Sequence, residues 1–148
     1  MHCIPYWGKP NRSNLKFLLI SDIQTDASVI NLKGDLLSDA NIDFMAAFVS
    51  NKITAKMHLD LVGRGASLKV RSITISALDN VQNIDVHMIH HAPNTLAEMT
   101  NIAIASENGK VILNGVGEVL QGMKGSNAFQ TLKGIITNDK AQIDVNPI

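Results

Sequence analysis

The sequence has little cysteine, few aromatic residues, no net charge and no long apolar run. Cys3 is the only cysteine among 148 residues, so the chain cannot form an internal disulfide or a thiolate metal site of its own. Lys and Arg number 13, as do Asp and Glu, so there is no overall basic charge to attract nucleic acid or an anionic membrane. Four Phe, one Trp and one Tyr are too few for a base-stacking surface.

No stretch approaches the ~18 apolar residues that a membrane-spanning helix needs. The first residues, "MHCIPYWGKPNRSN", lack the pattern of a secretory signal, so the cytoplasm is the expected compartment. The length suits one domain. We expect an irregular N-terminal arm over residues 1–14, which hold two of the four prolines, and a single domain over residues 15–148.

From Leu15 onward, short stretches rich in Ile and Val are separated by Asn, Asp, Gly and Ser, which is typical of strands and turns. Every second side chain is apolar in 53–61, and in 84–90 Ile84, Val86 and Met88 share one face with His90. A period of two predicts strands with one buried face. Two segments could instead be helical: 38–50 has polar residues suited to capping, and 95–99 carries a Thr and a Glu at capping-box spacing.

Small side chains and frequent turn residues favour an all-β fold, specifically a β-solenoid, whose coils have a thin interior and stack one strand spacing apart. No regular sequence repeat is visible. The pattern alone therefore leaves a β-sandwich or jelly roll as alternatives.

Four histidines, His58, His87, His90 and His91, are the candidate metal ligands, since neutral imidazoles bind zinc, iron and copper. Along a strand, however, His87 and His91 point to one face, about 13 Å apart, and His90 points to the other. We therefore expect no metal site, with His90 hydrogen-bonded inside a coil and the other two in solvent. A small metal-binding protein that uses the four histidines is the alternative.

No catalytic residue is expected, and the chain is predicted not to be an enzyme. The sequence contains no Gly-x-Ser-x-Gly nucleophile motif. Its glycines at 63–65 and in "NGVGEVLQG" lack the spacing of phosphate loops and are predicted to be strand-end turns. The carboxylates are scattered, with no reason to pair any two as acid and base: Asp60, Asp85, Glu98, Glu118 and Asp144.

Four segments together resemble the SufB/SufD family, scaffold subunits of an iron–sulfur cluster assembly complex: "HLDLVGRGASLKV", "HMIHHAPNT", "GKVILNG" and "NAFQTLKGIITNDKAQIDVNPI". The second matches a His-x-Ala-Pro-x-Thr pattern, the third a short strand ending in Asn-Gly, and the last a Gln, a Leu-rich strand, an Ala and Asp-x-x-Pro. Order and spacing agree across about residues 57–148. The matching positions are His90, Ala92, Pro93, Thr95, Asn114, Gly115, Gln130, Leu132, Ile135, Ala141, Asp144 and Pro147.

The resemblance implies a right-handed parallel β-helix that acts as a non-catalytic scaffold. It implies no cofactor bound stably by this chain, and it allows a transient iron–sulfur cluster in a larger complex. Implied partners are the chain itself or another SufB/SufD-like subunit, and an ABC-type ATPase, which family members dock through a C-terminal segment without a counterpart here. A stand-alone β-solenoid interaction module is a further alternative.

A parallel β-helix that ends at Ile148 exposes the unpaired backbone groups of its last coil, and such edges are normally covered. Family members pair through the C-terminal part of their β-helices. The expectation is therefore a two-fold homodimer with Ile143, Val145 and Ile148 near the contact.

Overall fold

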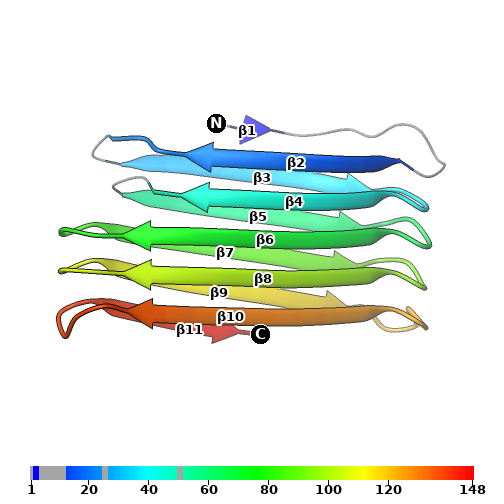
Figure 1. Ribbon diagram of the computed structural model, residues 1–148. Helices are drawn as coiled ribbons and strands as arrows, with labels where there is room; N and C mark the ends of the chain where they lie inside the picture. Colours follow the sequence, from blue (N-terminus) through cyan, green and yellow to red (C-terminus); the bar gives the residue numbers. More distant parts are fainter. Residues whose placement is uncertain (1, 4–12, 25–26, 50–51) are drawn as a thin grey trace.

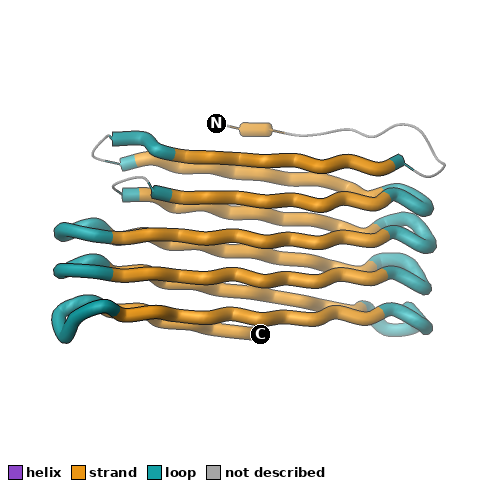
Figure 2. The backbone as a smooth tube through the Cα atoms, in the orientation of Figure 1, coloured by secondary structure: helices purple, strands orange, loops and turns teal. Residues whose placement is uncertain are grey.

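The computed structural model describes residues 2–3, 13–24, 27–49 and 52–148, and these form strands and turns without a helix. Most strands are eight to ten residues long, and the loops that join them are short (Figure 2). The strands are β1 (His2–Cys3), β2 (Asn14–Ser21), β3 (Ser28–Leu36), β4 (Asn41–Phe48), β5 (Ile53–Leu61), β6 (Ser67–Ser76), β7 (Val81–His90), β8 (Leu96–Ala105), β9 (Lys110–Val119), β10 (Asn127–Ile136) and β11 (Gln142–Pro147).

The strands form two parallel sheets, one of six strands in the order β1-β3-β5-β7-β9-β11 and one of five in the order β10-β8-β6-β4-β2. The chain alternates between the sheets, so each turn adds one strand to each. In Figure 1 the front strands run to the left and the rear strands to the right while the chain descends, which is a right-handed coil. The predicted right-handed parallel β-helix is confirmed.

The space between the sheets is filled by every second side chain, as the alternation predicts. On β5, Ile53, Ala55, Met57, Leu59 and Leu61 point inward and are buried, while the residues between them face outward. Strand β7 repeats the pattern. Burial of each Leu, Ile or Met side chain stabilises the fold by roughly 1.5–3 kcal/mol, so these inward-facing apolar side chains are the main source of stability.

Both segments that could have been helical are strands. In β4 the burial of side chains alternates along the whole strand, because Ile42, Phe44, Ala46 and Phe48 fill the interior. Thr95 caps no helix. Its hydroxyl oxygen lies 2.6 Å from His90 Nδ1 across the corner between β7 and β8.

The corners use backbone conformations that few side chains tolerate. Gly65 and Gly122 have positive φ, as the turn interpretation requires. Gly115 and Gly117 differ from that prediction, because they lie inside β9, which continues to Val119. A Cβ at Gly115 would lie 2.9 Å from the Met99 sulfur, so the missing side chain leaves room for packing in the interior.

The irregular arm expected over residues 1–14 falls largely outside the described residues. Of this segment, β1 pairs with β3 in parallel, and β2 begins at Asn14.

Candidate functional site

Three of the four candidate histidines gather on the outer face of the six-stranded sheet. His58 and His87 are register partners on β5 and β7, and their rings stack with centroids 5.8 Å apart. The third histidine, His91, is linked to His58 through Asp60. The Asp60 Oδ1 lies 3.3 Å from His58 Nε2 and 3.0 Å from His91 Nε2. All these side chains are at least partly exposed.

This arrangement does not favour a metal centre. In the part of the chain that the structure describes, no group of three or more His, Cys, Asp or Glu side chains could hold a metal ion. The Nε2 atoms of His58 and His91 already face one carboxylate oxygen, and His90 points to the opposite side of the sheet. The alternative of a site built from all four histidines therefore has no geometric support.

His90 is fully buried at the end of β7. Its Nδ1 contacts the Thr95 hydroxyl, which also lies 3.1 Å from the Ala92 carbonyl oxygen and 2.9 Å from Ser126 Oγ. Among the described residues, Nε2 has no hydrogen-bond partner. The "HAPNT" segment, residues 91–95, is thus the corner after β7 and is held by an internal hydrogen-bond network, and His90 is hydrogen-bonded inside the coil as predicted.

Burial lowers the pKa of His90 below its ordinary value of 6.5. Protonation would also place an N–H at Nε2, where it has no partner. The unfolded chain binds this proton more readily, so the stabilisation from neutral His90 is complete above pH 6.5 and is lost as pH falls below 6.5 toward the folded-state pKa.

We expect His90→Ala to lower the free energy of unfolding by about 1–3 kcal/mol at pH 7.5, because it breaks a buried hydrogen bond. The wild-type chain should also lose stability between pH 7 and pH 5 more steeply than this variant. Urea denaturation across that pH range measures both effects. His87→Ala and His91→Ala are the controls, because their exposed side chains should change stability by only about 0.5 kcal/mol. Equal losses in all three variants would contradict this assignment.

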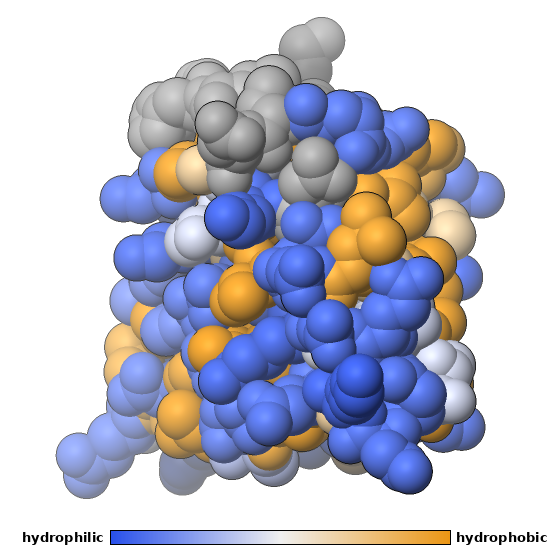
Figure 3. Space-filling model, turned by 90° about the vertical axis from the view of Figure 1, so that its left-hand side faces the viewer, coloured by the Kyte–Doolittle hydropathy of each residue, from blue (hydrophilic) through white to orange (hydrophobic). Residues whose placement is uncertain are grey.

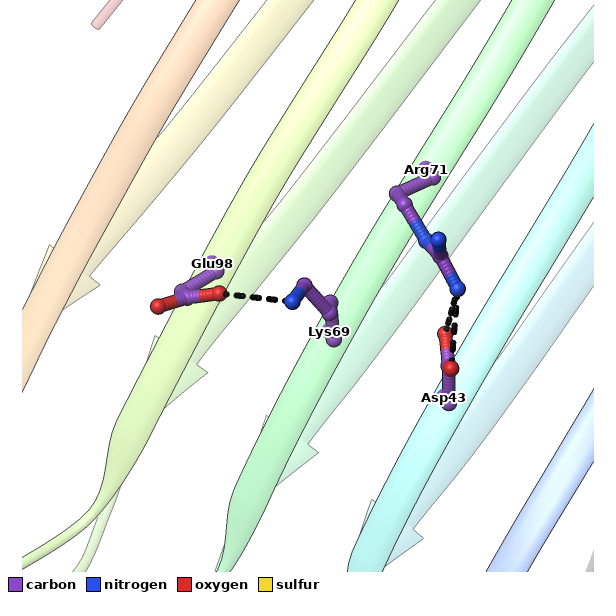
Figure 4. A network of polar contacts seen from close by, with 4 residues as sticks. All are labelled: Asp43, Lys69, Arg71 and Glu98. Carbon is purple, nitrogen blue, oxygen red and sulfur yellow. Dashed lines mark hydrogen bonds and ion pairs between the residues drawn. The ribbon is translucent and has the colours of Figure 1, made fainter.

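The outer face of the five-stranded sheet carries a row of charges that alternate in sign. Lys16, Asp43, Lys69 and Glu98 are neighbours in register on β2, β4, β6 and β8. Within the chain, Lys69 Nζ lies 3.4 Å from Glu98 Oε2, and Arg71 Nη2 donates to both Asp43 oxygens at 2.7 and 2.8 Å (Figure 4). The four residues of the row line a shallow hollow beside short Asn and Ser side chains.

Sequence reasoning missed this charge row, although Glu98 was considered alone. Its members are 26 to 29 residues apart along the chain, and only the sheet register brings them side by side. No local spacing in the sequence signals it.

Two of the three remaining candidate carboxylates link successive turns. Asp85 accepts a hydrogen bond from Asn114 Nδ2 at 2.5 Å, and Asp144 Oδ2 lies 3.9 Å from Lys110 Nζ. Glu118 is the register partner of Ile89. These contacts stabilise the stacking of turns and form no acid–base pair.

The three residues expected at a dimer contact have different environments. Ile143 and Val145 alternate with exposed residues along β11 and are half-buried, and Ile143 packs against the core. Ile148 is 75% exposed. The contact stays a prediction, and of the three side chains Ile148 is the most exposed.

Comparison with known proteins identifies one family. The model described as "SUF system FeS cluster assembly, SufBD core domain" matches residues 10–148. An iron–sulfur cluster assembly SufBD family protein of Staphylococcus saprophyticus is 26% identical over 110 residues, which cover 74% of this chain and 24% of that protein. Proteins of the same description from Staphylococcus epidermidis and Staphylococcus aureus are 27% identical over the same length. The chain thus spans about a quarter of the length of these curated relatives, and no solved structure matches it.

No helix in the described ranges is long and apolar enough to cross a bilayer.

Proposed function

Because this chain belongs to the SufBD family of iron–sulfur cluster assembly proteins, we propose that it is a non-catalytic β-helix scaffold subunit of that process, working in the cytoplasm. The observation that carries the proposal is the extent of the family match, which includes every strand from β2 to β11. The sequence motifs of the family lie in residues 57–148, and the family match extends this resemblance through the N-terminal turns.

The geometry suits a scaffold, a protein that offers outer surfaces to which partners bind. Side chains fill the space between the two sheets, and the polar clusters on the outside are contacts between successive turns. Under this proposal the partners are a second SufBD-type subunit, which can be a copy of the chain itself, and an ABC-type ATPase. A cluster would pass through the larger complex transiently.

Deletion of the gene in its native host tests the proposal. We expect the activity of an iron–sulfur enzyme such as aconitase to fall in extracts of cells grown under iron limitation, because cluster supply falls. An enzyme without a cluster is the control, and the wild-type gene should restore the activity. Unchanged iron–sulfur enzyme activity in the deletion strain would contradict a role in cluster assembly.

A second test concerns cofactor binding. We expect the purified chain to hold no stable iron–sulfur cluster after anaerobic reconstitution, because clusters are usually held by several thiolates and Cys3 is the chain's only cysteine. Absorption spectra and iron content after desalting measure the outcome. A stable cluster that disappears in Cys3→Ala would show the prediction to be wrong.

A further inference from the structure

The outer face of the five-stranded sheet exposes large apolar side chains that the scaffold proposal leaves unexplained. Ile20 is 65% exposed, Leu18 62%, Met45 44%, Ile75 38% and Ile73 36%. In Figure 3, viewed from the ends of these strands, the largest continuous apolar area lies at the upper right, on the side of this sheet. A contiguous apolar patch on a soluble fold commonly marks an interaction surface.

Part of the apolar patch forms a row that runs beside the charge row. Ile20, Ala47, Ile73 and Ile102 are register partners on β2, β4, β6 and β8. Each stands four residues after a member of the charge row, so an apolar row runs beside the charged row at a distance of about 13 Å. Both rows cross the same four strands.

We propose that this face binds the same face of a second copy of the chain, about a two-fold axis that runs parallel to the strands between β4 and β6. With such an axis, residues at the same position along the strands face each other in the two copies, and the order of the strands in one copy is the reverse of that in the other. Lys16 then faces Glu98 of the other copy, and Asp43 faces its Lys69. The apolar row faces itself, with Ile20 over Ile102 and Ala47 over Ile73.

The alternating signs select this register. An axis along β4 would place Asp43 over its own copy, and an axis along β6 would do the same for Lys69, so like charges would meet. An axis along the coil would reverse the strands and place charged residues over the apolar row. Charge complementarity of this kind selects one arrangement mainly by penalising the others.

The area is sufficient for a weak dimer. Four strands about 4.8 Å apart, each about ten residues long at about 3.3 Å per residue, give a footprint of roughly 600 Å² on each copy. The total of about 1,200 Å² lies at the lower limit of specific interfaces. We therefore expect dimerisation at micromolar concentrations. This inference does not depend on a role in cluster assembly, and it concerns a different surface from the end of the coil at Ile148.

Charge exchange tests the register. Sedimentation velocity of the wild-type chain should show a concentration-dependent dimer. Lys16→Glu places a carboxylate opposite Glu98, and Glu98→Lys places an ammonium group opposite Lys16, so each should raise the dissociation constant roughly tenfold or more. The double variant restores opposite charges at both positions and should recover the dimer. Lys16 takes part in none of the ion pairs of the described residues, so Lys16→Glu breaks no salt bridge within one copy.

Ile73→Lys tests the contact between the apolar rows of the two copies. The matched control is Val29→Lys, because Val29 lies on the outer face of the six-stranded sheet and is 56% exposed. We expect dissociation in the first variant only, with the far-UV circular dichroism of both unchanged. Ile148→Lys tests the end of the coil. A monomeric wild-type chain, failure of the charge exchange to restore association, or a dimer dissociated only by Ile148→Lys would overturn the proposal.

Discussion

Replacing Gly63 with alanine is expected to lower the free energy of unfolding by about 3 kcal/mol or more, because the new Cβ would overlap the backbone of the preceding turn. That Cβ would lie 1.9 Å from the Ser38 nitrogen and 2.2 Å from the Leu37 carbonyl carbon. Backbone atoms cannot turn aside as a flexible side chain can. The Gly63 N–H also donates to the Leu36 carbonyl oxygen at 2.9 Å, which ties the two turns together at this point.

Urea denaturation measures this effect, and Gly122→Ala is the control. Gly122 has a φ of +88°, but a Cβ there would meet no atom within 4 Å. The control should therefore cost only the roughly 1–2 kcal/mol of placing alanine in a left-handed conformation. A larger loss at Gly122 than at Gly63 would mean that backbone conformation, not close approach of the turns, governs the corners.

Phe44→Ala should destabilise the fold by about 3–5 kcal/mol, the range found for large aromatic side chains removed from protein cores. Phe44 is 2% exposed, and its ring stacks on Phe17 with centroids 5.3 Å apart. The substitution thus leaves a cavity between the two turns nearest the N-terminus. Phe129→Ala is the matched control, since Phe129 is 57% exposed on β10 and its loss should change stability by only about 0.5 kcal/mol.

Thermal unfolding and urea titration of both variants provide the measurement. Comparable losses in the two would mean that Phe129 is covered in solution and that the outer face of β10 is an interface.

The alternation in 53–61 and 84–90 was enough to predict strands and their buried faces, because a period of two has no helical explanation over that length. The same rule predicted that His90 would be inside the coil. It could not predict that Asp60 on β5 contacts His91 after β7, because that contact depends on which strands are neighbours. Local pattern determines the face of a residue, whereas register determines its partners.

The glycines show the same limit. Gly65 and Gly122 are at corners with positive φ, as predicted for turn residues. Gly115 belongs inside a strand because Met99 and Leu132 from the opposite sheet fill the space of its absent side chain. Only the packing across the interior distinguishes these two uses of glycine.

The absence of a visible repeat also has a structural reason. Ser28 pairs with Ile53, 25 residues later, whereas Val111 pairs with Ile143, 32 residues later. The strands keep similar lengths and the corners absorb the difference, so no fixed period survives in the sequence.

Parallel pairing between successive turns also sets the order of events during synthesis. No strand pairs with the strand that directly follows it in the chain, so there are no hairpins to form early among β1 to β11. The first native pairing must wait until a complete turn has left the ribosome, and at about 5–20 residues per second each turn takes seconds to appear. Loops of this size close in far less than a second. Each new turn can therefore settle on an edge that is already folded, so the growing protein serves as the template for its own next layer.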